Sequence, residues 1–324
     1  MGRTLLLFFR WGIFLLACLF LYTHLSADKS RQALDALLHP PTNGMVQWAL
    51  LLTSALMLAN WGVESYKWRW LMRPVERVGP WRALVATIAG TSVGFVTPNR
   101  TGEFLGRVLF LAPENRVRGG FATALGSIAQ FVVTLVLGGL ALLAMQLFHR
   151  PLPWPSGWIP AMLVSLTALV SIGALVLYLY PGLLRQLLLQ LPFLKRMEKA
   201  SAVLSAYARH ELLVVLLLSL LRYAVFAGQF VLLLRAFGAG GTLFNTVLAI
   251  PVVYLISTLV PTMMLTELGV RGSVAVAMFA PLGGMEGDVL LATTVLWLIN
   301  IVLPALVGSG ILLVARIRTK QRTA

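Results

Sequence analysis

The sequence is dominated by apolar blocks that are long enough to cross a lipid bilayer. A helix needs about 20 apolar residues to span the hydrocarbon core. Only 11% of the 324 residues are charged and 59% are hydrophobic, whereas roughly 25% of residues are charged in soluble proteins. A soluble globular enzyme is therefore excluded, and an all-α polytopic membrane protein is predicted. Its six full transmembrane helices are expected at 5–25, 45–66, 121–148, 158–180, 211–234 and 289–315.

Two further apolar stretches are each broken at a proline. The stretch 83–98 ends at Pro98, and its 16 residues would make a helix of about 24 Å, too short for a core of about 30 Å. A second short piece follows it, up to residue 112. The stretch 243–261 is interrupted at Pro251, ends at Pro261 and is followed by a short piece to residue 281. Each region is predicted to be either one broken span or a re-entrant helical hairpin.

The basic residues distinguish between these two alternatives. Loops rich in Lys and Arg stay in the cytoplasm, and the segments 67–82, 181–210 and 316–324 are basic. Two hairpins, at 83–112 and 243–281, place all three segments and both termini in the cytoplasm, whereas two single spans would put 181–210 outside. We therefore expect two re-entrant hairpins in the inner (plasma) membrane. The net charge of +15 is interpreted as topology and contact with anionic headgroups, and no nucleic-acid partner is expected.

The two breaks resemble each other in sequence. PNRTGEFLGR (98–107) and PTMMLTELGVR (261–271) both contain a proline, then a glutamate, and an arginine four residues after the glutamate. Because the hairpins would enter from opposite sides, an inverted repeat is predicted, with 45–148 and 211–315 as its halves. Such repeats build transporters whose site lies where broken helices meet near the midplane. Around them, a single membrane domain would comprise a first helix and external loop (1–44), a linking helix and cytoplasmic interfacial segment (149–210) and a basic tail (316–324).

The breaks also contain the charged side chains that are most expensive to bury in a membrane, so these are candidate site residues. Arg107 and Arg271 are expected to contact a lipid phosphate, and Glu103 and Glu267 to orient them or to take a coupling ion. The alternative is that each Glu only forms a salt bridge with the Arg four residues later. Arg222, halfway along a span, would be a second phosphate contact or the ion-pair partner of Glu64 or Glu267. Four more substrate-binding candidates lie at the freed backbone of the breaks: Pro98, Asn99, Thr101 and Thr266.

Other motifs predict packing rather than chemistry. Gly90 with Gly94, and Gly102 with Gly106, are pairs of small residues that allow close helix approach. Gly90–Gly94 also matches G-x-S-x-G, but the motif lies in a membrane segment, and the four histidines fall in loops or at span ends. No enzyme activity, cofactor or metal site is predicted. Interhelical hydrogen bonds are expected from four amide side chains: Gln130, Gln229, Asn245 and Asn300.

Over residues 45–315 the chain resembles the flippase-like family related to the transmembrane domain of lysylphosphatidylglycerol synthase. The resemblance rests on TPNRTGEFLGR, TELGVR and the order of spans around them. It implies a module that moves an anionic, aminoacylated or lipid-linked precursor between membrane leaflets. The sequence given ends nine residues after the last span, so the aminoacyl-transfer domain of the synthase, and with it synthase activity, is not expected.

Two alternative functions remain open from the sequence. One is a secondary transporter of a small anion, and the other is a non-transporting membrane partner of a lipid- or envelope-synthesis enzyme. Membrane lipids, a second copy in a homodimer and a lipid-synthesis enzyme are the expected partners. Because no ATPase motif is present, movement is predicted to be downhill or coupled to an ion.

Overall fold

The computed structural model describes residues 44–97, 100–154, 157–191, 195, 197–239, 241–262 and 264–315. Across these ranges the regular structure is helical, with no strand, so the all-α prediction is confirmed for this part of the chain. The predicted first helix with its external loop, and the basic tail, lie outside the described residues.

Five helices in the described ranges are long and apolar enough to cross a membrane. They match five of the six predicted spans within a few residues, except that one helix extends five residues beyond its predicted end at residue 66 and another begins five residues before its predicted start at residue 121. The fifth is continuous but contains a π-helical turn, Leu298–Val302. The helices are α3 (Gly44–Leu71), α6 (Arg116–Leu147), α7 (Trp158–Leu179), α11 (Arg209–Ala236) and the run of α14 (Glu286–Trp297) into α15 (Leu303–Val314).

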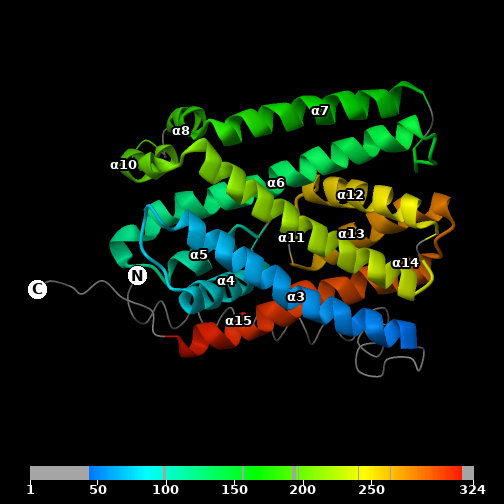
Figure 1. Ribbon diagram of the computed structural model, residues 1–324, viewed down its shortest axis with the longest axis horizontal. Helices are drawn as coiled ribbons and strands as arrows, with labels where there is room; N and C mark the ends of the chain where they lie inside the picture. Colours follow the sequence, from blue (N-terminus) through cyan, green and yellow to red (C-terminus); the bar gives the residue numbers. More distant parts are fainter. Residues whose placement is uncertain are drawn as a thin grey trace, which may run out of the picture.

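These long helices alternate in direction along the long axis of the molecule (Figure 1). Between α3 and α6 the chain forms α4 (Pro80–Phe95) and α5 (Gly102–Val108), and both connections lie at the same end of the bundle. Between α11 and α14 it forms α12 (Leu243–Leu259) and α13 (Met264–Phe279). The connection from α11 into this pair and the connection from the pair into α14 both lie at the opposite end of the bundle. Helix pairs therefore occupy the two predicted hairpin regions. The predicted interruption at Pro251 is wrong, because α12 continues through this residue and the break comes only after Leu259.

Glycines allow α4 to pack closely against α5 on one side and against α15 on the other. A Cβ on Gly106 of α5 would lie 2.6 Å from the Cα of Gly90, and one on Gly90 would lie 2.6 Å from the Cγ of Arg107. On the other side, a Cβ on Gly308 of α15 would collide with the carbonyl of Ile88. The predicted role of these small residues in helix packing is therefore confirmed for Gly90 of the first pair and Gly106 of the second, which allow α5 to pack against α4 in an antiparallel arrangement.

A single carboxylate ties the start of this helix pair to its end. Glu76, in the turn after α3, forms an ion pair with Arg82 at 2.9 Å and accepts a hydrogen bond from the backbone N–H of Ala112 at 2.8 Å. Burial by itself raises the pKa of Glu76, but the hydrogen bonds from Ala112 and Asn115 and the charge of Arg82 outweigh it and lower the pKa. Glu76 therefore holds the start of α4 close to the segment that follows α5.

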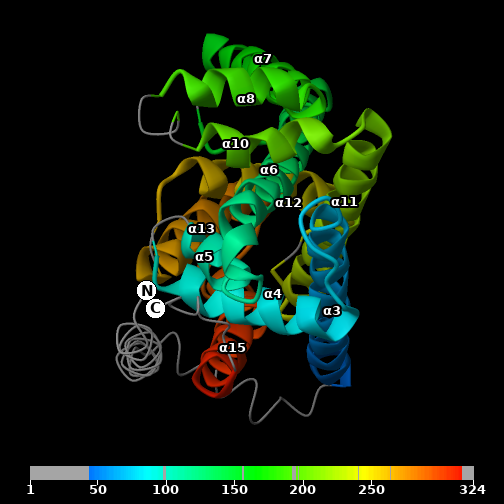
Figure 2. The same cartoon turned by 90° about the vertical axis from the view of Figure 1, so that its left-hand side faces the viewer.

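Helix α7 lies on the outside of the bundle, together with α8 (Pro181–Leu189), as the end-on view shows (Figure 2). Its apolar side chains are largely exposed, Leu169 by 70% and Trp158 by 71%, as expected of a helix that faces lipid. Along α8, Leu184 and Leu188 pack against the buried core whereas Leu183 and Leu187 are exposed. This division favours the predicted interfacial position for the segment after α7.

Candidate functional site

A cavity of about 450 Å³ lies where the two helix pairs meet. Residues from both broken regions line it: Arg100 from the first, and Thr262, Glu267 and Arg271 from the second. The long helices contribute one arginine together with amide, hydroxyl and aromatic groups, and α12 of the second pair contributes further hydroxyl and aromatic groups. These residues are Asn60 of α3, Gln130, Phe131 and Thr134 of α6, Arg222, Tyr223 and Phe226 of α11, Tyr254, Ser257 and Thr258 of α12, and Asn300 of the π-helical turn.

The turn between α4 and α5 brings Arg100 to the cavity. Thr97 accepts a hydrogen bond from the backbone N–H of Gly102 at 2.7 Å and donates one to the carbonyl of Val93 at 3.1 Å, so its hydroxyl satisfies backbone groups that the break leaves free. Arg100 has φ 58, in the left-handed region that residues with a side chain rarely adopt. Its Nε lies 3.1 Å from Oε1 of Glu103. Such an unfavourable backbone conformation is typical of functional positions.

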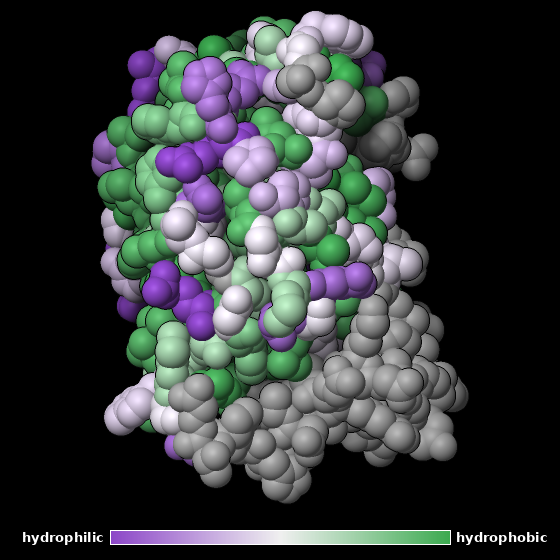
Figure 3. Space-filling model, turned by 90° about the vertical axis from the view of Figure 1, so that its right-hand side faces the viewer, coloured by the Kyte–Doolittle hydropathy of each residue, from purple (hydrophilic) through white to green (hydrophobic). Residues whose placement is uncertain are grey.

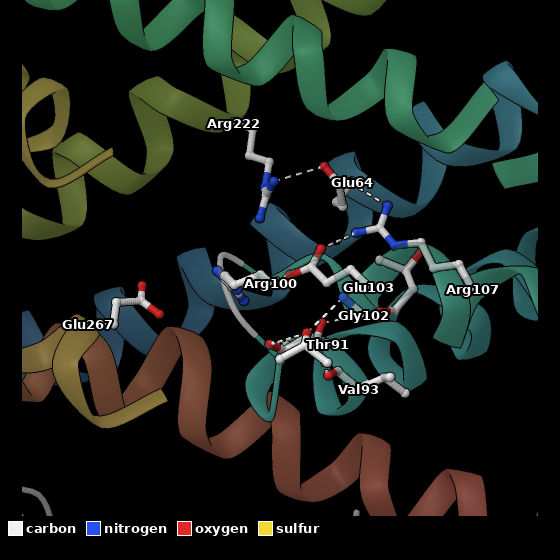
Figure 4. Close-up of polar contacts among 12 residues, drawn as sticks. Glu64, Thr91, Val93, Arg100, Gly102, Glu103, Arg107, Arg222 and Glu267 are labelled. Carbon is white, nitrogen blue, oxygen red and sulfur yellow. Dashed lines mark hydrogen bonds and ion pairs between the residues drawn. The ribbon is translucent and has the colours of Figure 1, made fainter. Parts of the chain in front are cut away.

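Behind the cavity, one buried carboxylate bridges three cations, and Figure 4 shows two of them, Arg107 and Arg222, beside Glu64. The Oε1 atom of Glu64 lies 2.7 Å from Arg107, and its Oε2 atom lies 2.8 Å from Lys67 and 3.0 Å from Arg222. These cations come from α5, α3 and α11, so the network joins three helices. Glu64 is only 4% exposed. Removing a partner from such a network leaves an uncompensated buried charge, which is strongly destabilising.

Arg107 belongs to this network and not to the cavity wall. Its guanidinium lies between Glu64 and Glu103, 3.0 Å from the latter, with a side chain that is 5% exposed. The predicted Glu103–Arg107 ion pair is therefore present. The predicted contact of Arg107 with a lipid phosphate has no support from its position, because Arg107 is absent from the cavity lining and its charge already meets two carboxylates.

The placement of Lys67 corrects an expectation from the sequence. The segment beginning at Lys67 was expected in the cytoplasmic loop after a span ending at Tyr66, but α3 continues to Leu71 and Lys67 is 2% exposed. Its amine pairs with Glu64 and donates to the hydroxyl of Ser219 at 3.4 Å. The glutamate three residues earlier is the signal for this, because i and i+3 lie on the same helical face.

Arg222 takes part in both the network and the cavity. Its Nη1 pairs with Glu64 at 3.0 Å, and its Nε donates to the side-chain oxygen of Asn60 at 3.0 Å. The predicted ion pair with Glu64 is therefore confirmed, and the same side chain lines the cavity. The network holds this guanidinium in the cavity wall.

The second break provides a guanidinium with free donors. Nη2 of Arg271 pairs with Oε1 of Glu267 at 3.0 Å, confirming the predicted pair. The guanidinium carbon lies 5.7 Å from the ring centre of Phe226 and 6.0 Å from that of Tyr254. Among the described residues, its buried Nε and Nη1 atoms have no hydrogen-bond partner. Buried donors are usually satisfied, so these two are free to bind an acceptor in the cavity.

The matching family model is the lysylphosphatidylglycerol synthase TM region, which covers residues 5–308. The chain belongs to this family. The match includes both breaks, all the cavity residues and the predicted first span, and it confirms the resemblance seen in the sequence. No curated protein and no solved structure matches the chain. Membership makes this a multi-pass membrane protein of a family linked to lipid modification and flipping.

For this member of the lysylphosphatidylglycerol synthase TM region family, four further substrate-binding candidates were predicted from the sequence: Pro98, Asn99, Thr101 and Thr266. Thr101 and Thr266 are exposed and are absent from the cavity lining. Pro98 and Asn99 lie outside the described residues. The predicted interhelical hydrogen bond of Gln229 is confirmed, since it donates to the carbonyl of Thr53 at 2.8 Å.

Two cavity residues were expected to serve only helix packing. Gln130 donates across helices to the carbonyl of Ser219 at 3.4 Å and also lines the cavity. Asn300 lines the cavity from the π-helical turn and donates to Leu296 of its own helix at 3.1 Å. Such turns are frequent at functional sites, and hydrophobic patterning does not reveal them. For Arg100, the signal in the sequence is its position directly after Pro98-Asn99.

Proposed function

We propose that this protein moves a lipid with a phosphate-bearing headgroup between the two leaflets of the membrane, and that the headgroup passes through the cavity. The observation that carries the proposal is that Arg100, Arg222 and Arg271 line one cavity together. Arginine presents planar, always charged donors that match the geometry of phosphate. These three arginines, and not Arg107, are then the phosphate contacts.

Family membership favours a lipid over a free anion as the substrate. A secondary transporter of a small anion is the second candidate, because the same arginines would bind an inorganic anion. We propose transport and not catalysis, either downhill or coupled to an ion, with Glu103 and Glu267 as the candidate carboxylates for such an ion. A homodimer and a lipid-synthesis enzyme remain predicted partners.

We further propose a membrane topology from the distribution of charge. Basic residues gather at the end where α3 finishes and α6 begins: Arg69, Arg73, Arg77, Arg82, Arg116 and Arg118. The opposite end, at which α3, α12 and α14 begin, mixes hydrophilic and hydrophobic residues (Figure 3) and carries Glu286 and Asp288 in the first turn of α14. The basic end is cytoplasmic by the positive-inside rule. The pairs α4–α5 and α12–α13 then enter from opposite sides as re-entrant hairpins of an inverted repeat, with the cavity near the midplane.

This topology predicts which single cysteines an impermeant thiol reagent reaches in intact cells. In a Cys18→Ser background, Gln190→Cys should be labelled only after the membrane is opened, because basic residues surround this position. Met285→Cys, which is 69% exposed at the other end, should be labelled in intact cells and serves as the matched control. Labelling of position 190 in intact cells would contradict the two-hairpin arrangement.

The lipid retained by the purified protein tests the proposed substrate class. Mass spectrometry of the protein extracted in mild detergent should detect a bound phosphate-bearing lipid. The Arg222→Gln/Arg271→Gln double variant should retain about tenfold less of it, because charge-assisted hydrogen bonds to phosphate are lost. Arg235→Gln, an exposed arginine on the same α11 helix, should retain as much as wild type. Equal retention by all three proteins would contradict the proposal.

A further inference from the structure

We infer that the cavity selects a doubly charged phosphate, as in a phosphomonoester or a diphosphate, over the singly charged phosphodiester of ordinary phospholipid headgroups. This inference rests on the proposed function and names the headgroup chemistry that the same cavity takes.

The charge balance of the site carries this inference. Three arginines and one glutamate, Glu267, are the charged residues that line the cavity among the described residues, which leaves two positive charges in excess. Behind the wall, Glu64 contacts Lys67 and Arg107 and also the lining residue Arg222. Glu103 contacts Arg107 and also the lining residue Arg100. The two carboxylates and the two cations behind the wall carry equal and opposite charge, so the cavity and the network together keep the excess of two.

The depth of the site makes this excess selective. A charge at the centre of the bilayer is costly, so a ligand that neutralises both positive charges is favoured over one that neutralises a single charge. A phosphomonoester carries roughly −1.5 to −2 at neutral pH and offers three strong acceptor oxygens. A phosphodiester carries a single negative charge and leaves one positive charge uncompensated.

The positions of the donors agree with the charge count. Arg271 has buried Nε and Nη1 donors without a partner among the described residues, and Phe226 and Tyr254 lie beside its guanidinium. A buried donor without a partner is unfavourable, so an additional acceptor oxygen is favourable here. Arg100 reaches the same cavity from an unfavourable backbone conformation, φ 58. The fold therefore maintains a third guanidinium in the cavity at an energetic cost.

Competition for binding to the purified full chain in a neutral detergent tests the preference. The probe is radiolabelled dioleoyl phosphatidic acid, a lipid phosphomonoester. The competitors are the unlabelled lipid, dioleoyl phosphatidylglycerol as the phosphodiester, and inorganic phosphate. Phosphatidylglycerol should require at least about tenfold more competitor than phosphatidic acid, because it offers fewer charge-assisted contacts.

The outcomes separate this inference from the proposed function. If phosphatidylglycerol competes as well as phosphatidic acid, or better, the charge preference is overturned while lipid binding stands. If inorganic phosphate competes as well as phosphatidic acid at equal concentration, the preference for a doubly charged phosphate is supported, and the lipid is overturned as its source. If neither lipid nor phosphate binds, both proposals fail.

Two variants test whether the charge count is the cause. Arg100→Gln lowers the excess charge of the lining by one, so the ratio between the two lipids should fall toward one. Glu267→Gln raises the excess by one, so the ratio should stay at least as large as in wild type. Arg235→Gln, outside the cavity, should leave the ratio unchanged. Because each ratio is measured within one preparation, partial unfolding does not alter it, and an unchanged ratio in Arg100→Gln overturns the inference.

Discussion

Replacing Glu64 with glutamine is expected to destabilise the protein by about 3–5 kcal/mol, because this substitution leaves buried cations without their carboxylate. Lys67 is the most affected, since Glu64 is the ion-pair partner that the structure gives it and its side chain is 2% exposed. Arg107 keeps Glu103 and Arg222 keeps Asn60. The measurement is the thermal midpoint of unfolding in detergent together with the yield of folded protein.

The same prediction has an internal test. Adding Lys67→Met to Glu64→Gln removes the stranded cation with little change in volume, so the double variant should recover most of the lost stability. Glu198→Gln on the short helix α10 (Glu198–Ser201), a carboxylate with a 68% exposed side chain, is the control and should change the midpoint little. If Glu64→Gln behaves like Glu198→Gln, or if its effect and that of Lys67→Met simply add, the network is not what holds α3, α5 and α11 together.

Replacing Arg271 with glutamine is expected to slow lipid movement between leaflets by roughly 10- to 100-fold, which corresponds to the loss of one or two charge-assisted hydrogen bonds. The stability of the folded protein should change less than the rate of lipid movement. Glu267, the residue that loses its partner, has a side chain that is already 13% exposed. Arg271→Lys keeps the charge and loses the planar fork, so its rate should lie between those of wild type and the glutamine variant. Arg235→Gln should move lipid at the wild-type rate.

The spans could be predicted from the sequence because hydrophobic length alone determines them. The start of α7 at Trp158 and the bounds of α12 and α13 agree with the apolar stretches within a few residues. The end of α3 was missed for a physical reason. A basic residue usually marks the cytoplasmic end of a span, but Lys67 remains inside because its helix provides Glu64 and α11 provides Ser219.

The candidate site was only partly predictable. The pairs Glu103–Arg107 and Glu267–Arg271 follow from helical periodicity, and both are present. Which arginine faces the cavity depends on contacts between residues far apart in the chain. Glu64 contacts Arg107, which lies 43 residues later in the chain. This contact places the Arg107 guanidinium in the buried network, whereas that of Arg271 lines the cavity. Local spacing is the same in the two pairs and does not distinguish them.

The movement of a phosphomonoester lipid with a fluorescent label on one acyl chain, between the leaflets of sealed vesicles containing the purified protein, measures the proposed function directly. Vesicles with wild-type protein should expose the inner-leaflet label to an impermeant quencher much faster than protein-free vesicles. Vesicles with Arg235→Gln should match wild type, and vesicles with Arg271→Gln should approach the protein-free rate. Equal rates with and without wild-type protein, or equal rates for wild type and Arg271→Gln, would contradict a lipid path through this cavity.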